Sequence, residues 1–451
     1  MLEPAEIFCE STRTVSLTRE EGRLLPPRTG VDAGTSVRLW TDGGDRFACR
    51  SGIDEPAIRE CLSLLGGKPE WNLARLAIPG NSGRLADDGE LRSGSAGFRR
   101  RIVNWLREAE ISVCAVLPEA VSCRSVFREF ARRVWILLPD GSVQVRSFHW
   151  AHAGIRVAAR VNGTTHNGLF RAGGIDPESL LKDHPPSRCA AVAVEDLDES
   201  RQSTRELSGE MPVVLSAAAA GTFFHEVCGH LLEGDAPVGA GTGLLPGGVG
   251  SRIRDPLTVF DDPTVPGFGG SAAVDDEGTA CRKTPLIADG RVVGRLLDRR
   301  GARLRASDPT GSGRRASFRD RPLPRLGNLF VTGGREGAGE AAGSCRWGIL
   351  IEELESGRVD PYTGEFRLVG RRGHLLRRGK ADRPVRGVQV FGSAVESLDR
   401  IEVLEQDGSA VGTTGSCLKE GQSLLTGLCS PPVRIGGLAV RSRTEGTDAD
   451  G

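Results

Sequence analysis

The sequence predicts an α+β protein in which a mixed α/β N-terminal domain, residues 1–205, precedes a largely β C-terminal domain, residues 206–440. In the first half, amphipathic helical patterns alternate with β-branched and aromatic runs that are typical of strands. The second half is rich in glycine and contains short apolar runs but few helical patterns. Residues 441–451 are polar, and we expect a disordered tail there.

Two helices are expected in the N-terminal domain. Asp54 can cap the first helix, and Gly66 can end it. The second should cover residues 98–109, and the Gly-, Ser- and Asp-rich stretch before it, residues 80–97, should be an exposed loop. Both helices align their apolar residues on one face: Ile58, Cys61, Leu62 and Leu65 in the first, and Phe98, Ile102, Trp105, Leu106 and Ala109 in the second.

A β-hairpin is expected next, because residues 133–138 and 143–148 are β-prone and flank a Pro-Asp-Gly turn sequence. Pro185 and Pro186 mark the expected approach to the C-terminal domain.

Further strands are expected in the C-terminal domain. Residues 286–287 and 292–293 flank Asp289 and Gly290, which predicts a second hairpin. Residues 349–351 and 388–390 are two more short apolar runs. Residues 299–325 contain nine arginines among turn-forming residues, and since charge runs are usually solvated we expect an exposed loop there.

Composition excludes several classes of function. Lysine plus arginine and aspartate plus glutamate are each 59, so no overall charge favours nucleic acid or anionic membranes. No apolar run reaches transmembrane length, and the N-terminal residues lack the basic and apolar parts of a signal peptide. Eleven cysteines without a Cys-x-x-Cys pair suggest reduced thiols. We therefore expect a cytoplasmic protein that binds neither nucleic acid nor membrane.

One helix of the C-terminal domain carries the most informative residues. Residues 211–215 are suited to a strand, Ser216 can cap the helix that follows, and four alanines favour it. His225, Glu226 and His230 then fall within six residues. Imidazole nitrogens are preferred ligands of zinc, and a carboxylate beside the metal can take a proton from water.

The spacing of these histidines is unusual. Residues i and i+5 of a regular helix lie about 140° apart, so one ion could not easily reach both. A π-type turn around Cys228 would bring His225 and His230 onto one face, and such turns often mark functional sites. The alternative is that both histidines pack in the core and Glu226 points to solvent.

Residue chemistry alone leaves the third ligand open. The candidates after the first histidine are His374 and five cysteines: Cys228, Cys281, Cys345, Cys417 and Cys429. Free cysteine is usually a small buried apolar residue. Cys417 differs because it follows a polar, turn-forming run, residues 413–416.

Several motifs resemble the TldD/PmbA metallopeptidases. Residues 224–235 read FHEVCGHLLEGD and look like the active-site helix of that family, which carries HExxxH. Four further stretches are similar to family motifs in the same order: residues 275–279 (DDEGT), 309–315 (PTGSGRR), 322–328 (PLPRLGN) and 415–422 (GSCLKEGQ). The resemblance covers most of the chain, most strongly residues 205–440. Cys228, Leu418 and the pair Leu424 and Leu425 depart from the family pattern.

The resemblance implies a site and a reaction. His225, His230 and Cys417 would bind one Zn²⁺ per chain, and Glu226 would act as the general base. The substrates would be unfolded or precursor peptides held by an edge strand. It also implies that Arg314 and Arg315 could bind a peptide carboxylate or backbone carbonyls.

The family resemblance also predicts which chains this protein assembles with. Members form two-chain assemblies, so we expect a homodimer or a heterodimer with a motif-less paralogue. Two alternatives remain, a non-catalytic TldE/PmbA-like subunit and a metal-stabilised peptide-binding protein.

Overall fold

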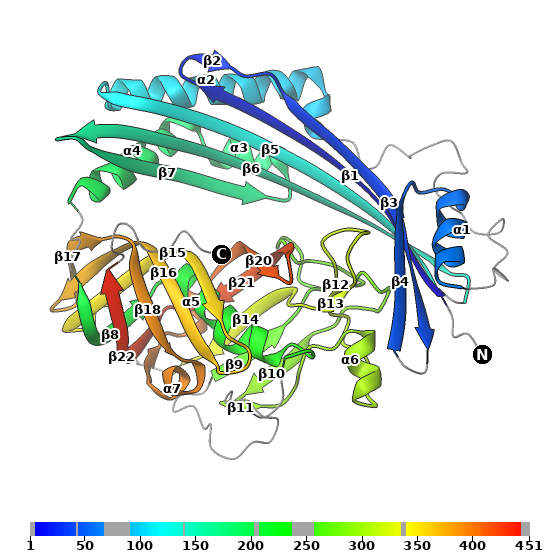
Figure 1. Cartoon of the computed structure of the whole chain (residues 1–451). Helices are drawn as coiled ribbons and strands as arrows, with labels where there is room; N and C mark the ends of the chain where they lie inside the picture. The colour runs from blue at the N-terminus through cyan, green and yellow to red at the C-terminus, as the bar shows by residue number, and fades with distance from the viewer. Residues whose placement is uncertain are drawn as a thin grey trace.

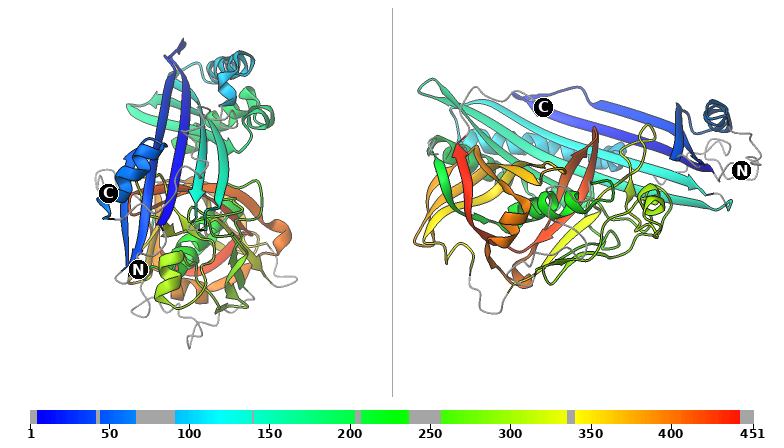
Figure 2. Two further views of the ribbon diagram at one scale, coloured as in Figure 1. Left: turned by 90° about the vertical axis from the view of Figure 1, so that its right-hand side faces the viewer. Right: turned by 60° about the horizontal axis from the view of Figure 1, so that its bottom comes forward.

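The computed structural model describes residues 5–41, 44–66, 91–138, 140–202, 207–236, 257–334 and 340–442. The first part of the chain forms an arched antiparallel sheet, which lies along a β-rich body formed by the C-terminal part (Figure 1). The further views show the long strands of this sheet crossing the length of the body (Figure 2). The predicted α+β class and the β-rich C-terminal region are confirmed.

The N-terminal sheet has the strand order β4-β3-β1-β5-β6-β7, and β2 pairs with β1. Its strands are β1 (Ala5–Glu20), β2 (Arg23–Leu24), β3 (Arg28–Thr41), β4 (Gly44–Ser51), β5 (Ala120–Leu137), β6 (Val143–Val161) and β7 (Thr164–Gly174). The predicted hairpin is the end of the β5–β6 pair, which continues in register to Ser122 opposite Ala158 and then shifts by one residue before Ala120. The sequence therefore predicted only the part of β5 and β6 that lies next to their connecting turn.

Four helices pack on one face of this sheet: α1 (Glu55–Leu64), α2 (Ala96–Val116), α3 (Pro177–Asp183) and α4 (Pro186–Gln202). Asp54 caps α1 as predicted, and Gly66 follows with φ 70°. α2 begins earlier than predicted because Ser95 caps it, and it also continues beyond residue 109 to Val116. The 3₁₀ turn η4 (Arg92–Gly94) precedes it, and residues 80–90 of the expected loop lie outside the described residues. Pro186 is the first residue of α4, where a missing N–H costs little, and α4 is the last helix before β8.

The C-terminal region contains two large sheets. The six-stranded sheet runs β11-β10-β9-β14-β21-β20. In the other sheet, β15, β8, β22, β18 and β16 form a closed ring, because β16 pairs back with β15, and β17 and β19 attach to β16 and β22. Asp289 and Gly290, with φ of 47° and 74°, form the predicted turn between β10 and β11.

The strands of the six-stranded sheet are β9 (Leu257–Asp261), β10 (Thr284–Ala288), β11 (Arg291–Val292), β14 (Asn328–Gly333), β20 (Val411–Lys419) and β21 (Gln422–Ser430). Those of the ring sheet are β8 (Ser208–Leu215), β15 (Trp347–Val359), β16 (Glu365–Arg377), β17 (Lys380–Val385), β18 (Val388–Ser393), β19 (Ile401–Leu404) and β22 (Val433–Ser442). The remaining elements are the β12 (Gly313–Arg314) and β13 (Leu323–Pro324) pair, α6 (Arg299–Leu304), α7 (Ala394–Asp399) and η7 (Asp407–Ser409).

The helix α5 (Ala217–Phe224) lies between the two large sheets. Phe223 and Phe224 are fully buried in one core with Leu329 of β14 and Ile351 of β15. This packing holds the predicted site helix from both sides. Among the described residues, no helix combines the length and apolar character needed to cross a bilayer.

Buried ion pairs join the N-terminal sheet to the C-terminal region. Arg315 pairs with Glu6 at 2.6 Å, and Arg38 pairs with Glu277. The expectation of a solvated arginine loop was therefore wrong for Arg315 and Arg325, each only 1% exposed. Carboxylates and carbonyls from distant segments compensate these charges, which a local charge pattern cannot reveal.

Candidate metal centre

The predicted site helix forms and changes its winding at the first histidine. Ser216 caps α5 by accepting the Ala219 N–H at 3.3 Å. The chain continues as a π turn, η5 (His225–Gly229), and a 3₁₀ turn, η6 (His230–Leu232). The backbone N–H of His230 donates to the carbonyl oxygen of His225, five residues earlier. The predicted wide turn is confirmed, and the two imidazole centroids lie 4.7 Å apart.

Cys417 lies beside both histidines. Its Sγ, on β20, is 3.3 Å from Nε2 of His230. One nitrogen of each imidazole and the sulfur lie within 4.8 Å of one another. Both ring nitrogens of His225 are buried, and neither makes a hydrogen bond of good geometry to any described residue. Buried polar groups are rarely left without a partner, so the donor set fits a metal ion.

The other candidate ligands lie apart from this cluster. Cys228 is fully buried among core side chains, and His374 pairs with Glu352 at 3.5 Å. Within the described parts of the chain, His225, His230 and Cys417 are the one group of three such side chains that could hold one ion.

The surroundings of Cys417 favour its thiolate form. Burial by itself would raise the pKa of the thiol, but the imidazoles of His225 and His230 outweigh burial and hold the pKa well below its usual value. Arg325 adds a guanidinium nitrogen 3.1 Å from the sulfur. The thiolate is the form of cysteine that binds metals.

Glu226 is buried, with 8% exposure, which excludes the alternative in which it points to solvent. Burial raises the pKa of its carboxyl group, while the neighbouring imidazoles of His230 and His225 oppose the rise. Gly357 of β15 lies against its side chain. A methyl group placed on Gly357 would be 2.8 Å from Cγ of Glu226.

Three charged residues around the cluster were not singled out from the sequence. One oxygen of Glu233 lies 2.9 Å from Nδ1 of His230 and 2.7 Å from Nζ of Lys419. Arg325 donates to the carbonyl oxygen of Cys417 at 2.8 Å as well as to its sulfur. A signal was present for two of them, since Glu233 follows His230 at i+3 and Lys419 follows Cys417 at i+2.

The arginines considered for peptide binding make contacts within the chain. Arg314 donates to the carbonyl oxygens of Leu326 and Leu425, and Arg315 pairs with Glu6. Their guanidinium groups are therefore engaged in the fold.

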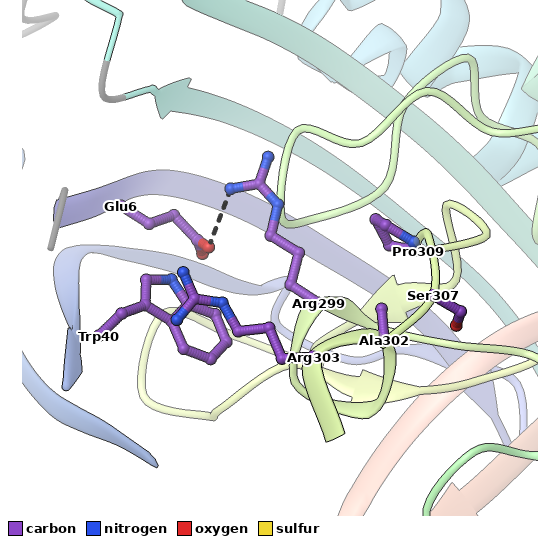
Figure 3. Close-up of a pocket in the computed structure, with 7 residues that line it drawn as sticks. All are labelled: Glu6, Trp40, Arg299, Ala302, Arg303, Ser307 and Pro309. Carbon is purple, nitrogen blue, oxygen red and sulfur yellow. Dashed lines mark ion pairs between the residues drawn. The ribbon is translucent and has the colours of Figure 1, made fainter. Parts of the chain in front are cut away.

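A hollow of about 300 Å³ lies where β1 and β3 meet α6 (Figure 3). Arg299 pairs with Glu6 at 3.7 Å, and the guanidinium of Arg303 lies 4.3 Å from the ring centre of Trp40. Its charged groups thus have partners, and no residue that lines it belongs to the His/Cys cluster.

A β-rich fold whose central helix carries two histidines and an acid indicates the metallopeptidase class. The chain belongs to the PmbA/TldA metallopeptidase family, because the sequence profile of that family's C-terminal domain matches residues 208–442. A Haemophilus influenzae protein named metalloprotease TldD homolog is 27% identical over 449 residues, which cover 97% of this chain and 92% of that protein. A Methanothermobacter thermautotrophicus protein named metalloprotease is 26% identical over 447 residues, with 96% and 94% covered.

Solved structures show the same fold. TldE from Thermococcus kodakarensis matches with a TM-score of 0.68 and 16% identity, covering 97% of each chain. A Thermotoga maritima protein described as a candidate modulator of a DNA gyrase matches with a TM-score of 0.70 and 19% identity, covering 97% of this chain and 95% of that one.

Proposed function

We propose that this chain is a zinc-dependent peptidase that hydrolyses peptide bonds in unfolded or precursor peptides. The observation that carries the proposal is the cluster of His225, His230 and Cys417, in which the buried nitrogens of His225 make no hydrogen bond of good geometry to a described residue. Relatives named metalloproteases support the same class of enzyme.

The three clustered side chains would hold one Zn²⁺ per chain. Two imidazoles and a thiolate form a ligand set that zinc accepts, and three protein ligands leave one position open. When bound, the ion would polarise the scissile carbonyl and make an attacking water more acidic.

In this proposal Glu226 is the general base. Its carboxylate accepts a proton from the attacking water and passes it to the leaving amine. Burial and the close approach of Gly357 restrict the side chain before substrate binds, which reduces the entropy lost on reaching a reactive geometry.

The position of β20 supports a peptide substrate in an extended conformation. β20 carries Cys417 and is an edge strand of the six-stranded sheet. An edge strand can pair with a peptide through backbone hydrogen bonds, which require little of the peptide's sequence. An unfolded segment meets this condition, whereas a folded substrate has its backbone groups already paired.

We also propose a two-chain assembly in the cytoplasm. The fold shared with TldE supports pairing of two such chains, either as a homodimer or with a motif-less paralogue. None of the eleven cysteines, all of which the structure describes, forms a disulfide bond, which is typical of a reducing compartment. The proposed division into domains at residues 205 and 206 falls between α4 and β8.

Metal analysis of the purified chain tests the site. We expect about one zinc per chain, its loss in Cys417→Ala, and its retention in Cys228→Ala, which removes the rival thiol. Cleavage of an unstructured peptide should stop when a chelator removes the metal. Full activity of metal-free protein would overturn the proposal.

The same assays separate the two alternatives. Metal-loaded protein that binds an unstructured peptide without cleaving it would indicate a metal-stabilised binding protein. Activity that requires a second, motif-containing chain would indicate a non-catalytic subunit.

A further inference from the structure

We infer that Glu233 and Lys419 form a positioning pair, which sets the tautomer of His230 and ties its helix to the strand of Cys417. This inference rests on the proposed metal centre and names the residues that assemble it. Neither residue is itself one of the three clustered side chains.

The contact between Glu233 and His230 decides which ring nitrogen carries the proton. Oε2 of Glu233 lies 2.9 Å from Nδ1 of His230. An ionised carboxylate can only accept, so Nδ1 donates and keeps its proton, which is the one proton left on the ring when the imidazole is in the neutral, metal-binding form. When a metal binds, Nε2, which lies 3.3 Å from Sγ of Cys417, is then the nitrogen that offers its lone pair to the ion. Carboxylates commonly orient a metal-binding histidine in this way.

Glu233 is itself held on three sides. Its side chain is 1% exposed. Oε1 accepts the backbone N–H of Leu326 at 3.3 Å, and Oε2 also accepts from Nζ of Lys419 at 2.7 Å. If the carboxylate turned away from His230, the buried N–H of Leu326 would lose its acceptor and the ion pair with Lys419 would break.

Lys419 ties together segments that are far apart in sequence. Besides Glu233, its ammonium group donates to Asp235 at 2.6 Å and to the carbonyl oxygen of Pro324 at 3.3 Å. All three N–H bonds thus have acceptors. Lys419 stands two residues after Cys417, and Glu233 three after His230. One ion pair consequently joins two elements whose proposed ligands are 187 residues apart.

A buried ion pair could instead serve stability alone, and zinc affinity separates the two roles. A positioning pair acts on metal binding, whereas a purely structural pair lowers the stability of metal-free and metal-loaded protein alike. The full-length chain offers a matched control in Glu129, a buried carboxylate that lies 2.6 Å from Nε2 of His149 in the N-terminal sheet.

Competition with a chromophoric chelator measures zinc affinity in Glu233→Gln and Glu129→Gln. Glutamine at 233 keeps the size of the side chain but lacks the charge that accepts from both His230 and Lys419. We expect zinc affinity to fall about 10- to 100-fold in Glu233→Gln and to stay unchanged in Glu129→Gln. The absorption spectrum of the cobalt-substituted protein should change only in the former.

Lys419→Met tests the other half of the pair and remains informative if Glu233→Gln does not fold. Zinc affinity should fall in this variant too, and the double variant should bind zinc as well as Glu233→Gln alone, because both changes act through one contact. Unchanged affinity in either folded single variant, or additive losses in the double variant, would overturn the inference. A wild-type chain that binds no zinc would instead overturn the proposed function and this inference together.

Discussion

Gly357→Ala tests the proposed general base without changing any charged residue. The added methyl group would lie 2.8 Å from Cγ and 3.3 Å from Cδ of Glu226, and 3.2 Å from Cδ2 of Leu368. Carbon atoms in contact prefer about 3.5–4.0 Å, so the glutamate side chain must shift by about 1 Å. A displacement of about 1 Å can slow a reaction by about 100-fold, equivalent to about 2.7 kcal/mol of activation free energy.

Steady-state cleavage of an unstructured peptide, with zinc content measured on the same sample, is the assay. We expect kcat to fall by about 10- to 100-fold while zinc content stays at the wild-type level. Gly97→Ala is the control, because a methyl group at that position of α2 meets no other atom within 4 Å. A zinc-loaded Gly357→Ala enzyme with wild-type kcat would refute the reasoning, since Glu226 would then be either unconstrained by β15 or not the base.

Three further predictions concern the base, acid stability and assembly. Glu226→Gln should keep its zinc while cleavage falls by about 10²–10⁴-fold, and retention of most activity would refute its role. Although burial opposes it, Arg146, Arg132 and Arg315 lower the pKa of Asp276 to about 2, below its ordinary 3.8. The ionised carboxylate of Asp276 should therefore add about 2 kcal/mol to the free energy of unfolding above about pH 4, and this contribution should be lost as the pH falls toward 2. Urea unfolding should show this loss, and Asp276→Asn should remove that part of the pH dependence. Light scattering of the chain, alone and with a motif-less paralogue, should show a two-chain particle. A monomer in both samples that still cleaves peptide would contradict the proposed two-chain assembly.

Local chemistry was enough to predict several elements. Asp54 and Ser216 cap their helices because a side-chain oxygen one residue before a helix satisfies an exposed N–H, whatever the rest of the fold does. Asp289 and Gly290 form a tight turn for a similarly local reason, their tolerance of positive φ. The lengths of β5 and β6 were not predictable, because pairing with neighbouring strands extends them beyond their own β-prone residues.

In the candidate site, too, the sequence predicts some features and tertiary contacts decide the others. The i, i+5 spacing of His225 and His230 by itself determined that the helix must widen if both rings are to meet, and the π turn follows from that. Residue chemistry could not choose Cys417 among the cysteines, and the family resemblance supplied that choice. The tertiary structure places its sulfur beside the histidines across 187 residues of chain. Spacing offered a signal for Glu233 and Lys419, but only the tertiary structure brought these two together and placed Arg325 beside Cys417. Their roles depend on long-range contacts and burial, which remove charged groups from water and make each partner necessary.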